Sequence, residues 1–339
     1  FPDLHPNQSL LLQLLLPPPS VLSFLYCPST LLTSRLYRSQ TDTALMNTTS
    51  FPTCCNMFSF INRFTKVVPM FLDPNYKRFS KIGDYLPPFG IKSQGMITHS
   101  CLCSRRLYSS IHFECCKTCI IVGNGGILAN KSLGQRIDQF DVVVRLNEAP
   151  VKGFEKDVGS KTTMRITYPE GAIQKIERYE AQSLFVLSAF KALDFNWLRH
   201  MVFNQRLVST DGFWKSVARR VPREPSDMRI LNPYFIQEAS FKLIGLPYNN
   251  GQMGRGNIPT LGTVAITMAL HNCDEVAVAG FGYNMSTPHA PLHYYEKIRM
   301  SAIKESWTHN ISKEKEFLVK LVKAGVIQDW TNGICGAGC

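Results

Sequence analysis

Short, continuous apolar segments recur along the chain from residue 115 onward, and they alternate with stretches whose apolar residues have helical spacing. Uninterrupted runs rich in Val, Ile and Leu are typical of strands buried on both faces, as in parallel sheets. We expect strands at 119–123, 141–147, 184–188, 228–231 and 275–280. The pattern predicts helices at 131–139, 261–270 and 313–323.

Alternating strands and helices of this kind predict the fold class. We expect an α/β protein with a single Rossmann-like domain, whose mainly parallel central sheet is flanked by helices. The last expected helix supports this arrangement, because its apolar residues share one face and its charged residues the other.

The N-terminal part of the chain has a different composition. Residues 1–60 contain no Gly and no Lys, and the first Glu of the chain is Glu114. The apolar run 10–16 ends at three consecutive prolines and is too short to cross a bilayer, which takes about 20 residues. We therefore expect residues 1–60 to be poorly ordered and foreign to the folded domain.

Overall composition excludes several classes of protein. The 339 residues are 45% hydrophobic and 18% charged, which excludes a disordered chain, a collagen-like fibre and a coiled coil. The net charge of +12 suits an anionic partner such as nucleic acid, a membrane, a nucleotide or an acidic glycan, and does not choose among them. Nothing resembling a nucleic-acid-binding motif is present, so we expect no nucleic-acid partner.

The cysteines give little evidence for a metal site. There are eleven, so at least one is unpaired. Cys116 and Cys119 form a C-x-x-C pair, but no second pair follows at the spacing of a zinc finger. We therefore expect no metal site.

A glycine-rich segment, GNGG at 123–126, directly follows the first expected strand. Phosphates bind at this position in doubly wound folds, because Gly allows close approach to the backbone and the next helix offers free N–H groups. A nicotinamide cofactor is disfavoured, since Leu128 replaces the third small residue of the dinucleotide pattern. Asn124 and Asn147 end successive strands and offer amides to a ribose, base or phosphate. Alternatively, each Asn adopts the left-handed conformation of a tight turn.

Three histidines lie near the C-terminal end of the chain. His289 lies among Pro and Thr in an expected loop, and we assign it no role. His293 follows the strand 275–280, at the sheet edge where active sites form. His309 precedes Glu314 by five residues at the start of the last helix. A histidine can act as a general base while a nearby carboxylate fixes its tautomer, although a lone histidine is more often structural.

Four segments occur in the order of motifs that define a known family. They are 119–126 with 157–163, 259–282, HYYE at 293–296, and His309 with Glu314. They resemble the large, small, third and very small motifs of the eukaryotic sialyltransferases, glycosyltransferase family 29. Within that family, segments 230–238, 253–260 and 285–288 resemble the β-galactoside α2,3-sialyltransferases that act on N-acetyllactosamine ends.

The resemblance implies a GT-A-like variant of the expected fold and a specific reaction. This reaction is the inverting transfer of sialic acid from CMP-N-acetylneuraminate to the 3-hydroxyl of a terminal galactose on Galβ1-3/4GlcNAc glycans. The acceptors would be glycoproteins or glycolipids, and neither a metal nor another cofactor is expected.

Residue roles follow from the same resemblance. His309 would be the base that removes the galactose proton, His293 would stabilise the departing CMP phosphate, and Glu314 would support the site. Cys119 and Cys273 would form a disulfide. The donor would be bound by Asn124, Asn147, Thr260, Gly262, Phe281 and Gly282.

The resemblance also divides the chain. We expect a non-globular segment at 1–60, a partly divergent approach segment at 61–114, a catalytic domain at 115–330 and a divergent tail at 331–339. Family members are Golgi type II membrane proteins, so we expect a lumenal domain that associates with the membrane through a signal anchor missing from this chain. The divergent stretch 96–114 leaves an alternative: a catalytically inactive protein of the same fold that binds nucleotides or glycans.

Overall fold

The computed structural model describes residues 70–72, 117–207, 209–249, 254–282, 287–302 and 308–338. The expectations for residues 1–60, and for almost all of 61–114, lie outside the described residues.

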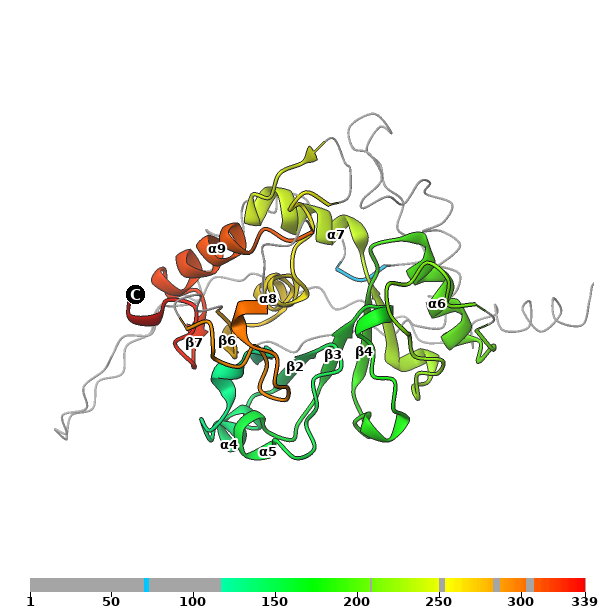
Figure 1. Ribbon diagram of the computed structural model, residues 1–339, viewed down its shortest axis with the longest axis horizontal. Helices are drawn as coiled ribbons and strands as arrows, with labels where there is room; N and C mark the ends of the chain where they lie inside the picture. The colour runs from blue at the N-terminus through cyan, green and yellow to red at the C-terminus, as the bar shows by residue number, and fades with distance from the viewer. Residues whose placement is uncertain are drawn as a thin grey trace, which may run out of the picture. The chain divides into compact units, whose positions relative to one another are not determined.

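A parallel sheet forms the centre of the described chain (Figure 1). Within the described ranges its order is β5-β4-β3-β2-β1-β6-β7, and every neighbouring pair is parallel. The chain runs outward from β1 to β5 and then returns to the other side of β1, so the strand order reverses between β1 and β6. The strands are β1 (Thr118–Val122), β2 (Val142–Leu146), β3 (Met164–Thr167), β4 (Leu184–Ser188), β5 (Met228–Leu231), β6 (Glu275–Ala279) and β7 (Gln328–Asp329).

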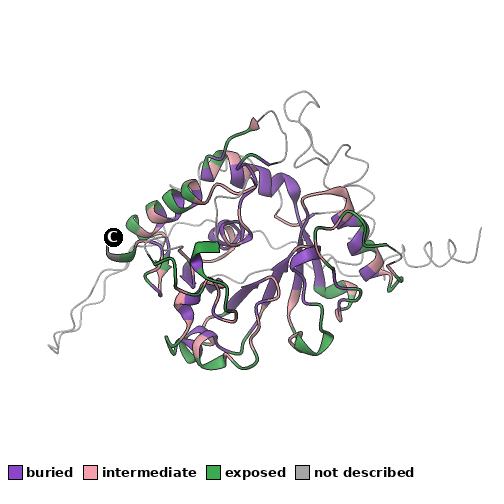
Figure 2. Ribbon diagram, viewed as in Figure 1, coloured by how far each residue is buried: buried purple, intermediate pink, exposed green. Residues whose placement is uncertain are grey.

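Helices cover both faces of this sheet (Figure 1). In β1, Cys119 and Ile121 pack in the core cluster that contains α8, whereas Ile120 and Val122 pack in the cluster on the opposite face. The strands are therefore buried on both sides, as the continuous apolar runs predicted (Figure 2). The helices are α4 (Gly134–Ile137), α5 (Glu155–Val158), α6 (Ala192–Val202), α7 (Pro233–Glu238), α8 (Leu261–Asn272) and α9 (Ile311–Lys323); a π-helical segment, Ala239–Ile244, extends α7.

The structure confirms the predicted fold class and the five predicted strands, but it adds β3 and the short β7 and shortens one helix. Strand β3 was missed because its segment, MRIT, has only two apolar residues, Met164 and Ile166; all four of its residues are nevertheless buried. The expected helix 131–139 is only the single turn α4. Asn130 and Ser132 have φ of 61° and 54°, and their N–H groups donate to the carboxylate of Asp157 instead of entering a helix.

The predicted disulfide between Cys119 and Cys273 is present. It joins β1 to the residue that ends α8, across 154 positions of sequence. The two segments that carry the largest expected motifs are thus covalently connected at the edge of the sheet where β1 and β6 begin.

Candidate active site

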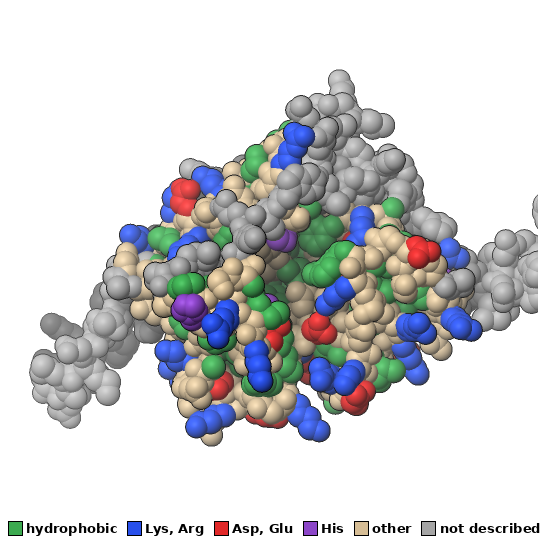
Figure 3. Space-filling model, viewed as in Figure 1, with side chains coloured by type: hydrophobic (Ala, Val, Ile, Leu, Met, Phe, Trp, Pro, Cys, Tyr) green, Lys and Arg blue, Asp and Glu red, His purple; other side chains and the backbone are tan. Residues whose placement is uncertain are grey.

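A cavity of about 740 Å³ lies at the carboxyl ends of the strands. Figure 3 shows it as a hollow near the middle of the face, with a histidine side chain at its edge. Loops after β1, β2, β3, β4 and β6 line it, together with the first turns of α8 and α9. This is where open parallel sheets bind ligands. The expected residues that line it are Asn124, Asn147, Thr260, Gly262, Phe281, Gly282, His293, His309 and Glu314.

Glycines bring the loops after β1 and β6 into direct backbone contact. A Cβ atom on Gly123 or Gly125 would lie 2.5 or 2.6 Å from the carbonyl oxygen of Gly280, closer than real Cβ atoms approach. The N–H of Gly125 donates to that same oxygen at 3.0 Å. Only glycine fits here, because the floor of the cavity is built from backbone rather than from side chains.

Asn124 presents an unsatisfied amide oxygen. Its Nδ2 atom lies 3.5 Å from the hydroxyl of Tyr295, but its Oδ1 is buried and has no hydrogen-bond partner among the described residues. Leaving a buried acceptor unpaired costs about 1–3 kcal/mol. A ligand that donates a hydrogen bond to Oδ1 would remove this cost.

Asn147 is held from behind in the left-handed conformation, with φ of 52°. Its carbonyl oxygen accepts a hydrogen bond from Arg165 at 2.6 Å, and its Oδ1 accepts one from the hydroxyl of Thr167 at 3.3 Å. Arg165 is itself paired with Glu180. The backbone of Asn147 thus has the left-handed turn conformation that was the alternative to a binding role, while its side chain still lines the cavity.

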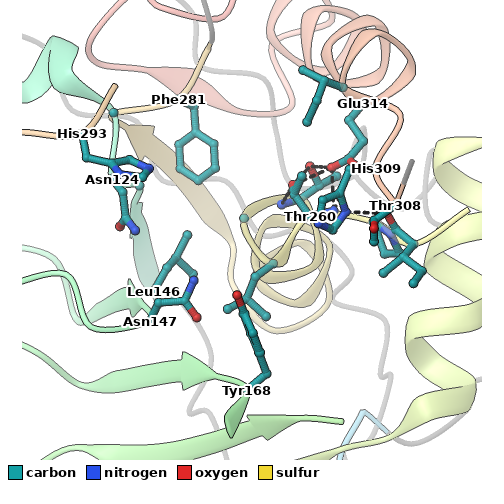
Figure 4. Close-up of a pocket in the computed structure, with 18 of the residues that line it drawn as sticks. Asn124, Leu146, Asn147, Tyr168, Thr260, Phe281, His293, Thr308, His309 and Glu314 are labelled. Atoms are coloured by element: carbon teal, nitrogen blue, oxygen red, sulfur yellow. Dashed lines mark hydrogen bonds between the residues drawn. The ribbon is translucent and has the colours of Figure 1, made fainter. Parts of the chain in front are cut away.

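An antiparallel bridge between Gly125 and His293 places the histidine beside Asn124 (Figure 4). The N–H of Tyr294 extends the contact by donating to the carbonyl of Asn124 at 3.1 Å. Nδ1 of His293 is hydrogen-bonded to the carboxylate of Glu296, and the ring stacks on Tyr295 with 5.4 Å between ring centroids. Because Glu296 occupies Nδ1, Nε2 is the ring nitrogen left for a ligand.

His309 lies across the cavity from His293, at the start of α9 (Figure 4). Its Nδ1 is 2.8 Å from the carbonyl oxygen of Ile258. A carbonyl can only accept, so Nδ1 carries the hydrogen and the lone pair of the neutral ring is on Nε2. This is the tautomer that a base acting through Nε2 requires.

Glu314 is buried and contacts α8 rather than setting the tautomer of His309. Its carboxylate accepts hydrogen bonds from the N–H of Thr260 and from the hydroxyls of Thr260 and Thr263, the last two at 2.5 Å. Burial raises the pKa of Glu314, while the hydrogen bonds from Thr260 and Thr263 oppose that shift. Glu314 therefore joins the first turns of α8 and α9, which both line the cavity.

The loop Gly280–Gly282 is packed between α8 and the C-terminal segment. A Cβ atom on Gly262 would lie 2.7 Å from the ring of Phe281, and one on Gly282 would lie 1.9 Å from the carbonyl oxygen of Gly333. The buried Ile334 also lines the cavity. The segment expected as a divergent tail, 331–339, thus begins with residues that pack against the site; the domain boundary itself stays a prediction.

One wall of the cavity was not predicted. It consists of residues that follow β3 and β4, together with a loop before β5 that includes Trp214. No motif or spacing marks these positions in the sequence. Glu170, in YPEG at 168–171, follows a buried strand as the expected asparagines do, but that strand, β3, was itself not predicted. The polar and aromatic members of the wall are Tyr168, Glu170, Phe190, Lys191, Asp194 and Trp214.

The described ranges contain no group of three or more His, Cys, Asp or Glu placed to hold a metal ion. Across these same ranges, no helix has both the length and the apolar character needed to cross a membrane.

Sequence comparison decides the family. Residues 72–326 match the profile of glycosyltransferase family 29 (sialyltransferase). The chain belongs to this family. This sialyltransferase is 66% identical to the human CMP-N-acetylneuraminate-beta-1,4-galactoside alpha-2,3-sialyltransferase over 82% of its own chain and 75% of that protein. Identity to the mouse protein of the same name is 64%, with the same coverage. Identity to the human lactosylceramide alpha-2,3-sialyltransferase is 43%, over 74% of this chain and 62% of that one.

A solved structure has the same fold. It is described as the crystal structure of a mammalian sialyltransferase, with a TM-score of 0.61 and 24% sequence identity over 82% of this chain and 95% of the other. The predicted family and fold are thus confirmed, and the sialyltransferase is an enzyme of the glycosyltransferase class.

Proposed function

We propose that this sialyltransferase transfers sialic acid, with inversion, from CMP-N-acetylneuraminate to the 3-hydroxyl of a terminal galactose on Galβ1-3/4GlcNAc glycans. The observation that carries the proposal is the pair of histidines in one cavity: Nε2 is the available nitrogen of His293, and the lone pair of neutral His309 is also on Nε2. The relatives named for this activity support the same substrates.

The donor end of the cavity is proposed to be the part closed by the glycine loops. Asn124 and Asn147 offer amide groups to the nucleotide, and Phe281, Gly262 and Gly282 shape the wall beside it. Thr260 caps α8 by accepting a hydrogen bond from the N–H of Thr263. Leu261 and Gly262 of the first turn line the cavity, where the positive end of the helix dipole favours a negatively charged group.

The reaction is then a single displacement. The lone pair of galactose O3 forms the new bond to C2 of the sialyl group, while Nε2 of His309 takes the hydroxyl proton. The bond from C2 to the phosphate oxygen of CMP breaks, and its electron pair stays on that oxygen. A protonated His293 donates from Nε2 to the phosphate as this charge develops. Because these groups meet both needs, we expect neither a metal nor another cofactor to take part.

We expect the acceptor to be carried by a glycoprotein or glycolipid, and the enzyme to act on the lumenal side of the Golgi membrane. Both expectations rest on family membership. Microscopy of the tagged full-length protein against Golgi markers tests the location.

A linkage assay tests the reaction. The protein is incubated with CMP-N-acetylneuraminate and Galβ1-4GlcNAc or Galβ1-3GlcNAc, and the product is digested with an α2,3-specific sialidase. We expect a product that this sialidase removes completely. A folded sample that binds CMP in calorimetry but sialylates no galactoside would instead support the alternative of an inactive binding protein.

A further inference from the structure

The unpredicted wall of the cavity carries a buried charge cluster. Nζ of Lys191 lies 2.8 Å from Oε1 of Glu170 and 3.0 Å from Oδ1 of Asp194. The two carboxylates are buried, while the lysine side chain is 30% exposed and lines the cavity. Two carboxylates and one ammonium give the cluster a formal charge of −1.

Lys191 is held in a fixed position by this cluster. Asp194 also accepts hydrogen bonds from the N–H groups of Phe190 and Lys191, which fixes the carboxylate at the start of α6. Burial alone would lower the pKa of Lys191, but the charges and hydrogen bonds of Asp194 and Glu170 outweigh it and raise the pKa. Oε2 of Glu170 is buried and has no hydrogen-bond partner among the described residues. The wall thus presents a charged hydrogen-bond donor, the ammonium of Lys191, and a hydrogen-bond acceptor, Oε2 of Glu170.

Trp214 stands at the edge of the same wall and is 69% exposed. A large aromatic side chain that is this exposed beside a cavity is typical of a binding surface. The indole does not lie on an isolated loop: Nζ of Lys215 is 5.6 Å from its ring centroid and 3.0 Å from Oε1 of Glu148, the residue after Asn147. Lys215 therefore connects the Trp214 ring to the residue pair that follows β2, and Trp214 lines the cavity.

We propose that Lys191 and Trp214 form the subsite for the uncharged acceptor sugar. A pyranose has hydroxyls around its edge and C–H groups on its faces, so an ammonium can donate to the edge while an indole packs against a face. The net charge of the cluster disfavours the donor at this wall. CMP-N-acetylneuraminate carries a phosphate and a carboxylate, and the two buried carboxylates offset the attraction of the Lys191 ammonium for either anion. This inference rests on the proposed function.

Trp214→Ala tests the subsite. We expect the KM for N-acetyllactosamine to rise about tenfold, as loss of an aromatic contact would produce, with the KM for CMP-N-acetylneuraminate and the melting temperature unchanged. Trp214→Phe should recover most of the affinity for the acceptor. Ile176→Ala is the matched control, since Ile176 is also a large exposed side chain, at 46%, and does not line the cavity.

Lys191→Arg gives a second, charge-preserving test that does not leave two buried carboxylates unpaired. The longer, planar guanidinium should raise the acceptor KM while the donor KM stays within about twofold of wild type. An acceptor KM unchanged in both Trp214→Ala and Lys191→Arg, or a rise confined to the donor KM, overturns the subsite. The proposed function fails separately, through a wild-type protein that forms no α2,3-linked product.

Discussion

The two walls of the cavity are built from different materials. On one side, glycines after β1 and β6 bring backbones together, and a strand-like bridge adds His293. On the other side, the surface consists of side chains: a charge cluster at the start of α6 and an indole on a loop. The first wall is fixed by backbone contacts, whereas the second can change with single substitutions that leave the backbone intact.

This difference fits the two proposed ligands. The proposed donor is a single sugar nucleotide, and backbone groups and asparagine amides can bind it. Acceptor sugars differ among enzymes of one family, and side chains on loops and helix starts are the part of a scaffold that changes most easily. Substitutions on each wall should therefore affect the kinetic constants of only one substrate.

Substitution of His309 should have the largest effect on activity. His309 is the proposed base and belongs to neither wall. His309→Ala should lower kcat by about 10²–10⁴-fold, because the galactose hydroxyl loses its base. CMP binding, measured by calorimetry, should change little. His289→Ala is the matched control, since His289 is exposed and does not line the cavity. An equal loss of CMP affinity in His309→Ala would mean that His309 binds the donor, together with the wall built by the glycine loops.

Gly125→Ala should be the next most damaging change, and it should act on the donor. The new Cβ would lie 2.6 Å from the carbonyl oxygen of Gly280, so the loops after β1 and β6 must separate. Displacement of catalytic groups by about 1 Å can cost about 10²-fold in activity, and we expect a loss of this size in kcat/KM for the donor.

Gly338→Ala provides the control for Gly125→Ala, because a Cβ at position 338 meets nothing within 4 Å. The acceptor KM should stay near the wild-type value in both variants. Wild-type donor kinetics in Gly125→Ala would mean that the close backbone contact is not needed for donor binding.

The wall built by the glycine loops, which is the proposed donor side, was also the part that could be predicted. Asn124 and His293 were found because buried strands have a recognisable apolar pattern, and parallel strands place the residues after them at one edge. The family motifs identified the same positions. Local pattern therefore specified the strand ends and the residues that follow them.

The opposite wall, the proposed acceptor side, could not be found in this way. Lys191 follows β4 and Trp214 lies on a loop before β5, so only the fold places both at one cavity. Neither residue belongs to a periodic pattern. Glu170 and Asp194 look like ordinary surface residues in sequence, and only tertiary packing buries them. The same holds for Arg165, whose burial depends on carbonyl groups and on Glu180.

The smallest expected effect concerns the support of the donor wall from the C-terminal segment. The hydroxyl of Thr331 accepts a hydrogen bond from the N–H of Gly280 at 3.1 Å and donates to Asp329 at 3.0 Å. Thr331→Val keeps the volume but removes both contacts, and a single hydrogen bond contributes about 0.5–1.5 kcal/mol. We therefore expect the donor KM to rise about two- to tenfold, with kcat and the acceptor KM little changed.

Thr331→Ser separates the hydrogen bond from the packing of the methyl group, because serine keeps the hydroxyl and loses only the methyl. It should restore the donor KM. If serine and valine raise the donor KM equally, the methyl contact rather than the hydrogen bond supports Gly280. If the acceptor KM rises instead, the C-terminal segment acts on both walls, and the division of the cavity into two independently adjustable surfaces does not hold at this loop.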